Sequence, residues 1–108
     1  MKYRVLITNA AQADLDEIYE WIRDHDSPAR AEYVLERVFQ VAESVATLPD
    51  RGSCPRELAP VIDVEYRQVF FKPYRIIYEV EGANIIVHLI ADGRRNLQSL
   101  LRRRLTAK

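Results

Sequence analysis

The sequence predicts an α+β fold in which a short N-terminal strand, two helices, three strands and a last helix follow one another. Three observations lead to this prediction. Apolar residues recur at helical spacing between residues 10 and 48, alternate at every second position from residue 61, and return to helical spacing after Gly93. A chain of 108 residues with 48% hydrophobic residues suits one folded domain, which we expect over residues 1–108.

The N-terminal half contains the signals of a strand and two helices. The first residues alternate in a pattern with one clearly apolar face, which predicts a short strand. Asn9 fits the N-cap of a helix over residues 10–24. Ser27 and Pro28 fit the cap and the first position of a second helix, whose apolar stripe reaches Leu48. Because few residues separate the two helices, we expect an antiparallel helical hairpin.

The C-terminal half predicts a meander. Residues 61–71 and 74–81 alternate around a turn at Lys72 and Pro73, and the nearly continuous apolar run 85–91 predicts a strand buried on both faces. We expect these three antiparallel strands to complete one sheet with the N-terminal strand, and the helical hairpin to pack on one face. Leucines at helical spacing after the last strand predict a C-terminal helix.

Two patterns in these strands allow a structural and a functional interpretation. Alternating aromatic residues could stack nucleic-acid bases, but they are more typical of the sheet face that packs on helices. These residues are Tyr66, Phe70, Tyr74 and Tyr78. His88 has no acidic or nucleophilic neighbour in its motif, so we expect a hydrogen-bonded core histidine and not a general base.

Charge is balanced over the whole chain but divided along it. Sixteen basic and sixteen acidic residues cancel, which excludes a globally basic nucleic-acid binder and a globally acidic mimic. Residues 9–48 carry a net charge of −6 and residues 82–108 a net charge of +5, and thirteen of the basic residues are arginine. Guanidinium groups suit phosphate and carboxylate recognition, so we expect an anionic partner at the C-terminal part.

Several classes of site and location are not expected. Cys54 is the only cysteine and the two histidines lie far apart, so the sequence predicts no disulfide, no metal site and no cofactor. Because no run of about 18 apolar residues and no signal-peptide pattern is present, we expect a cytoplasmic protein without membrane contact. The acidic positions of the first helix are expected to form a solvated face; they are Asp14, Asp16, Glu17 and Glu20.

The chain resembles the RelE/ParE superfamily of bacterial toxins over nearly its whole length. The resemblance rests on the order of elements, the strand motif Tyr-Arg-Ile-Ile-Tyr at 74–78, the Leu-Pro…Gly break at 48–52 and the Gly-Arg-Arg end at 93–95. It implies the growth-inhibiting toxin of a type II toxin–antitoxin system, of the kind linked to plasmid stabilization. The implied partner is a cognate antitoxin protein, bound in a hetero-oligomer.

The superfamily has two branches with different activities. RelE-like members are ribosome-dependent mRNA endonucleases, whereas ParE-like members are reported to inhibit DNA gyrase without cutting nucleic acid. Arg75 and Arg95 match arginines of the RelE-like site, but Tyr66 and Gln68 replace its second-strand lysines and Leu101 replaces its tyrosine. Arginine stabilises phosphate charge but is a poor proton donor or acceptor. The resemblance therefore favours the gyrase-inhibiting branch, with the ribosome and mRNA as the alternative target.

Two groups of candidate residues follow. The target-binding candidates are Arg67, Lys72, Arg75, Arg94 and Arg95. The antitoxin-binding candidates are large side chains that a small core does not fully cover: Trp21, Tyr33 and Phe39. The structural alternative for Arg75 is an exposed strand residue paired with Glu65 or Glu79. The arginines at 102–104 are expected to be solvated near a helix C-terminus, where the dipole favours cations.

Overall fold

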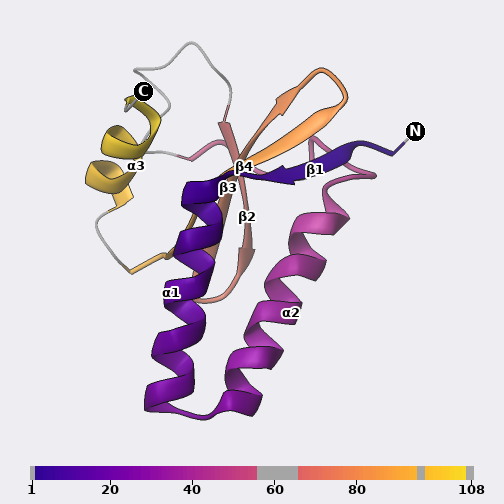
Figure 1. Ribbon diagram of the computed structural model, residues 1–108. Coiled ribbons are helices and arrows are strands. Elements are labelled where there is room, and N and C mark those ends of the chain that lie inside the picture. Colours follow the sequence, from indigo (N-terminus) through magenta and orange to yellow (C-terminus); the bar gives the residue numbers. More distant parts are fainter. Residues whose placement is uncertain (1, 56–65, 95–96, 107–108) are drawn as a thin grey trace.

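The computed structural model describes residues 2–55, 66–94 and 97–106 (Figure 1). The elements are β1 Arg4–Ile7, α1 Asn9–His25, α2 Pro28–Ser44, β2 Tyr66–Phe71, β3 Tyr74–Glu81, β4 Asn84–Asp92 and α3 Leu97–Thr106. The sheet order is β1-β4-β3-β2, with β1 parallel to β4 and the other neighbours antiparallel. The predicted hairpin, meander and C-terminal helix are confirmed; the expected start of β2 at residue 61 lies outside the described residues.

Side-chain caps set the start of both helices of the hairpin. The Thr8 hydroxyl accepts a hydrogen bond from the Ala11 amide at 3.1 Å, so the prediction of Asn9 as N-cap is wrong by one residue. Thr8 is still extended, because its own amide donates to β4, and the chain turns helical only after it. Ser27 caps α2 and Pro28 takes the first helical position, as predicted.

α2 is shorter than its apolar stripe predicts. The helix ends at Ser44 and gives way to tighter turns. The Tyr3 amide donates to the Ala46 carbonyl at 2.8 Å, which ties this segment to the start of the chain. Leu48, the expected end of the stripe, is consequently 61% exposed.

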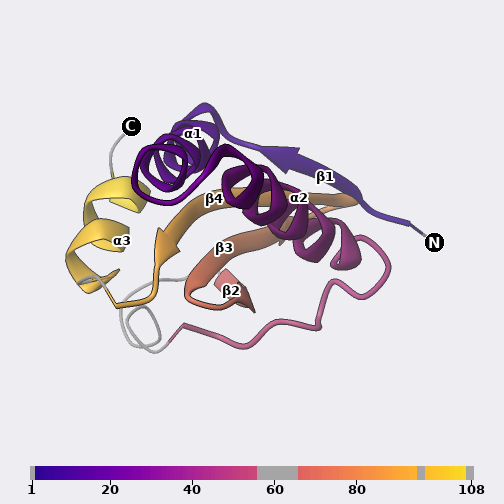
Figure 2. The same ribbon diagram turned by 90° about the horizontal axis from the view of Figure 1, so that it is seen from below.

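The sheet has a core on each face. In Figure 2, α1 and α2 lie side by side over one face, and α3 lies beside the C-terminal end of β4. The larger core lies under the hairpin, and its most buried members are Ala11, Leu15, Ala31, Val38, Val45, Ile76, Tyr78, Ile85 and Val87. The smaller core lies on the opposite face, where Leu100 of α3 covers Tyr66, Ile77, Leu89 and Ala91.

A bulge at His88 explains the continuous apolar run of β4. Ile77 pairs with Leu89 but Tyr78 pairs with Val87, so His88 is an extra residue in the ladder. The side chains change face at this point: Val87 belongs to the larger core and Leu89 to the smaller one. His88 bonds to Glu79 at 2.6 Å, so the expected hydrogen-bonded histidine is found, partly buried below the bulge.

The alternating aromatic residues do not share one face, and that prediction is wrong. The turn at Lys72 and Pro73 places Phe71 opposite Tyr74, so odd positions of β2 share a face with even positions of β3. Tyr74 and Tyr78 therefore pack under the helices, whereas Tyr66 lies in the smaller core. Phe70 is 49% exposed.

β4 extends beyond the strand that pairs with its outer edge. β1 reaches only as far as Val87, so the later residues of β4 have no described strand on that side. The Asp14 carboxylate accepts from the Ile90 amide at 3.1 Å, and the Arg104 guanidinium donates to the His88 carbonyl at 2.9 Å. Two side chains thus satisfy backbone groups that a neighbouring strand would otherwise bind.

Asp14 and Arg104 also bind each other and join α1 to α3. Two hydrogen bonds of 2.8 and 2.9 Å link the carboxylate to the guanidinium, and the side chains are 14% and 26% exposed. The hydrogen bond to Asp14 raises the pKa of Arg104. The prediction that both side chains are solvated is therefore wrong. It failed because a contact between residues 90 positions apart leaves no local sequence signal.

The loop after α2 is held against β2 and β3. The Tyr78 hydroxyl donates to the Pro49 carbonyl at 2.8 Å and accepts from the Gly52 amide at 3.0 Å. A side chain on Gly52 would place its Cβ 2.5 Å from the Gln68 carbonyl oxygen and 2.7 Å from the Tyr78 hydroxyl. This close approach of two main chains requires glycine.

We expect Gly52→Ala to lower the free energy of unfolding by about 1 to 3 kcal/mol, because the added methyl group overlaps main-chain atoms of β2. Urea unfolding of the purified chain measures the change. Ser53→Ala, at the exposed neighbouring position, is the control and should stay within about 0.5 kcal/mol of wild type. Equal stability of Gly52→Ala and wild type would contradict the close approach.

We expect Asp14→Ala to lower the free energy of unfolding by about 1 to 3 kcal/mol, because it removes the acceptor of the Ile90 amide and the carboxylate partner of Arg104. Amide hydrogen exchange in α3 should become faster at the same time. Asp16→Ala removes an exposed carboxylate of the same helix and should change neither measurement. Unchanged exchange in α3 of Asp14→Ala would show that the pair does not hold this helix.

Candidate interaction surfaces

The sheet face opposite the helical hairpin carries a hollow of about 590 Å³ beside the β2–β3 turn, which we call the basic hollow. Its lining residues are Ser53, Cys54, Gln68, Phe70, Lys72, Pro73, Arg75 and Gly93. Two predicted target-binding residues, Lys72 and Arg75, therefore lie together. No acidic residue is among the described residues that line this hollow, so its field favours an anion.

Neighbouring residues orient Arg75 within the basic hollow. Its Nε donates to Gln68 Oε1 at 2.8 Å, and its Nη2 donates to the same oxygen. The aliphatic stem lies over Gly93, where a Cβ would come within 3.1 Å of Arg75 Cδ. Of the two carboxylates suggested as structural partners, Glu79 binds His88, and Glu65 lies outside the described residues. Arg75 is thus partly buried and held in one orientation.

The other basic candidates are not brought to this hollow. Arg67 donates from Nη1 to the carbonyl oxygens of Asp50 and Gly52, at 3.2 and 2.7 Å, and so holds the loop after α2. Arg94 forms a bidentate ion pair with Asp92, in which Nε donates to Oδ1 at 2.9 Å and Nη2 donates to Oδ2 at 2.6 Å. The Arg94 side chain is 79% exposed. Arg95 lies outside the described residues.

The basic hollow is suited to binding an anion and not to moving protons. Lys72 and Arg75 supply positive charge, and the exposed ring of Phe70 offers a stacking surface. His88 is bound to Glu79 and packs edge-on against Tyr66, with ring centroids 5.5 Å apart, and it is not among the described residues that line the hollow. Tyr66 itself is only 8% exposed.

The described part of the chain contains neither a metal-binding cluster nor a membrane-spanning helix. Within residues 2–55, 66–94 and 97–106, no group of three or more His, Cys, Asp or Glu side chains could hold a metal ion. No helix in these same ranges is both long and apolar enough to span a bilayer.

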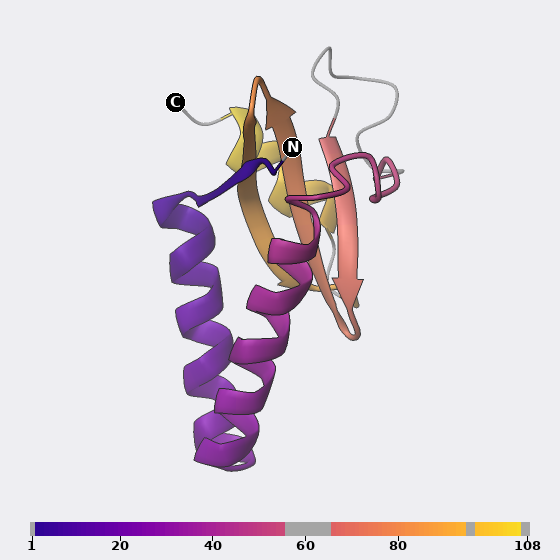
Figure 3. The same ribbon diagram turned by 90° about the vertical axis from the view of Figure 1, so that its right-hand side faces the viewer.

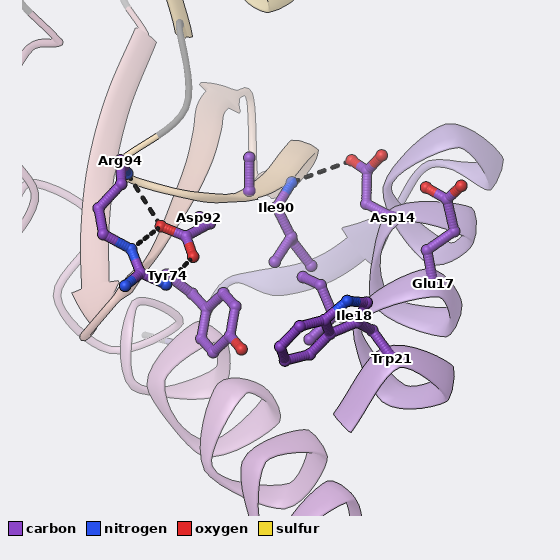
Figure 4. Close-up of a pocket in the computed structure, with 9 residues that line it drawn as sticks. Asp14, Glu17, Ile18, Trp21, Tyr74, Ile90, Asp92 and Arg94 are labelled. Atoms are coloured by element: carbon purple, nitrogen blue, oxygen red, sulfur yellow. Dashed lines mark hydrogen bonds and ion pairs between the residues drawn. The ribbon is translucent and has the colours of Figure 1, made fainter. Parts of the chain in front are cut away.

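A second hollow, of about 310 Å³, lies between α1 and the end of β4; we call it the aromatic hollow (Figure 4). Its lining residues are Asp14, Glu17, Ile18, Trp21, Tyr74, Ile90, Ala91, Asp92 and Arg94. The rings of Trp21 and Tyr74 extend toward each other from opposite sides (Figure 4). Burial raises the pKa of Tyr74, and the charge of Asp92 raises it further. The structure thus brings together Trp21 and Arg94, which the sequence assigned to different partners.

The three antitoxin-binding candidates are all exposed, but they do not form one patch. Trp21 is 62% exposed, Tyr33 49% and Phe39 37%. Tyr33 lies edge-on to Phe71, with ring centroids 6.2 Å apart, and thus on the flank of α2 that faces β2. Phe39 follows six residues later, which places it roughly 120° from Tyr33 around the helix.

Sequence reasoning missed the second hollow and its acidic rim. Asp14 and Glu17 were expected on a solvated face, yet both line the aromatic hollow. The spacing of Asp14, Glu17 and Trp21, three and four residues apart, does place them on one helix face and was an available signal. Nothing local indicated that Tyr74 and Asp92 would form the opposite wall.

Comparison with known proteins identifies the family. The family model of the ParE toxin of the type II toxin–antitoxin system parDE matches residues 5–97. Toxin ParE3 of Caulobacter vibrioides is 26% identical over 98 residues, which cover 91% of this chain and 94% of that protein.

Two solved structures have the same fold. A chain of the chromosomal ParDE system from P. aeruginosa superposes with a TM-score of 0.68 at 20% identity, over 84% of this chain and 96% of that one. A chain of the RelBE2 toxin–antitoxin complex from Mycobacterium tuberculosis gives 0.60 at 22% identity, over 85% and 99%. Because the family model spans most of the sequence, this chain belongs to the ParE toxins of type II toxin–antitoxin systems.

Proposed function

We propose that this toxin stops growth by binding DNA gyrase in the cytoplasm, without cutting nucleic acid, and that a cognate antitoxin neutralises it. The composition of the basic hollow supports a binding function most directly. Arg75 and Lys72 offer positive charge there, while His88 is engaged with Glu79 outside it. Gyrase as the target comes from the ParE-like branch that the chain resembles.

The target contact is proposed to centre on Arg75. Gln68 and Gly93 hold this side chain in place, so binding an anionic group costs less side-chain entropy than it would for a free surface arginine. Lys72 and Phe70 flank it in the same hollow. Arg94 and Arg95 remain in the proposed target-binding set on the sequence argument, and Arg67 contributes indirectly by holding the loop that lines the hollow.

We expect purified toxin to inhibit supercoiling of relaxed plasmid by gyrase and to leave mRNA uncut on translating ribosomes. The reason is that an arginine-centred hollow binds anions but lacks the acid–base pair that attack by a ribose hydroxyl needs. The two assays are run on the same toxin preparation. Codon-specific cleavage in the ribosomal A site would overturn the proposal and support the RelE-like alternative.

A matched pair of variants tests the hollow itself. Arg75→Ala should raise the toxin concentration for half-inhibition of gyrase about tenfold, the effect of losing one charge-assisted hydrogen bond. Arg23→Ala removes an exposed arginine of α1 and should inhibit gyrase like wild type. Unfolding curves check that both variants are folded. Equal inhibition by Arg75→Ala and wild type would place the target contact elsewhere.

The antitoxin is proposed to cover the helical hairpin. Large exposed side chains on both helices favour a partner segment that folds on binding. Figure 3 shows that the end of the hairpin with the α1–α2 turn projects past the sheet, where a partner can reach it. The toxin would then exist as a hetero-oligomer with its antitoxin.

We expect the cognate antitoxin to protect Trp21, Tyr33 and Phe39 from solvent, because these side chains are 62%, 49% and 37% exposed in the chain alone. Hydroxyl-radical footprinting of the toxin with and without antitoxin measures each side chain separately. The exposed Leu48, in the turns that follow α2, serves as the internal reference. Unchanged labelling of all three aromatic residues in the complex would count against this surface.

A further inference from the structure

The aromatic hollow has the shape and charge of a site for one basic side chain. The exposed ring of Trp21 forms one wall and Tyr74 the other, with Ile18 and Ile90 among the remaining lining residues. The hollow measures about 310 Å³, which is larger than a single side chain and leaves room for the main chain that carries it. Figure 4 shows its lining side chains between α1 and β4.

Within the described part of the chain, two of the three carboxylates that line the hollow have an arginine partner and the third has none. Asp14 is paired with Arg104, and Asp92 is paired with Arg94. Glu17 makes no hydrogen bond or ion pair with any residue in the described part of the chain, although its charge acts on Arg104. Among the described residues that line the hollow, three carboxylates accompany one guanidinium group, that of Arg94, so the net charge of the lining favours a cation.

The Trp21 indole is oriented by stacking on a second ring, that of His25. One face of the indole stacks on the His25 ring, with centroids 4.3 Å apart and planes at 11°. His25 Nδ1 in turn lies 2.9 Å from the Trp21 carbonyl oxygen, which holds the imidazole in place. The indole also lines the hollow, and the electron-rich face of tryptophan is the preferred aromatic surface for a guanidinium.

We infer that the aromatic hollow receives an arginine side chain of the antitoxin, stacked on Trp21 and paired with Glu17. Arginine fits better than lysine, because its planar group can stack on a ring while its edge donates to a carboxylate. The antitoxin is favoured as the source because the hollow adjoins the helical hairpin, which it is proposed to cover. This inference rests on the proposed antitoxin partner.

A double-mutant cycle tests the contact. Each arginine and lysine of the cognate antitoxin is changed to glutamine in turn, and its affinity is measured for wild-type toxin and for Glu17→Gln. For one arginine we expect about a tenfold loss on wild-type toxin and little further loss on Glu17→Gln, the signature of direct coupling. Asp16→Asn, an exposed carboxylate about 100° from Glu17 around α1 and outside the lining of the hollow, is the control and should couple to no antitoxin residue.

Fluorescence supplies a second readout. Trp21 is the only tryptophan of the toxin, so a change in its emission on binding reports occupation of the hollow. The antitoxin used must lack tryptophan, or any tryptophan in it must be replaced by phenylalanine. The change should be lost when the coupled arginine is replaced by glutamine. Inhibition of gyrase by free Glu17→Gln toxin should equal that of wild type.

The outcomes separate this inference from the proposed function. Tight binding with additive effects for every antitoxin arginine and lysine would overturn the inference and leave the antitoxin partnership standing. Failure of wild-type toxin to bind the antitoxin would overturn both. Loss of gyrase inhibition by folded Glu17→Gln toxin would assign the hollow to the target and overturn the antitoxin assignment.

Discussion

The edge of β4 beyond Val87, where no described strand pairs with it, is the constraint on which the arrangement of this toxin depends. β1 covers β4 only as far as Val87, and the remaining backbone groups need partners on that side. Asp14 supplies an acceptor and Arg104 a donor, and their mutual pairing fixes α1, β4 and α3 relative to one another. The last helix is thus held by polar contacts to the sheet edge as well as by Leu100 on the smaller core.

Ion pairs also neutralise part of the positive charge in the C-terminal part of the chain. The C-terminal part carries +5, but Arg104 is committed to Asp14 and Arg94 to Asp92. The positive charge that shapes a hollow comes instead from Lys72 and Arg75, which belong to the β2–β3 hairpin. This hairpin is therefore better suited to bind an anionic target than the arginine-rich end of the chain is.

The two hollows lie on opposite sides of the sheet and differ in chemistry. The basic hollow is on the face opposite the helical hairpin, whereas the aromatic hollow lies against α1 and is rimmed by carboxylates. An anionic target and a partly basic antitoxin would then use different surfaces. Under this arrangement, neutralisation need not compete directly with the proposed target contact at Arg75, because the antitoxin would bind on the helical side.

The sequence by itself determined the type and order of the elements, because apolar periodicity and capping residues are local signals. It also indicated Lys72 and Arg75 as target-binding candidates, and the fold brings these two together in the basic hollow. Only the tertiary structure decided the bulge at His88, the pairing of Asp14 with Arg104 and the joining of Trp21 with Tyr74 across a hollow. These features depend on contacts between distant segments, and a one-residue shift in strand register reverses which side chains face the helices, so no local pattern encodes them.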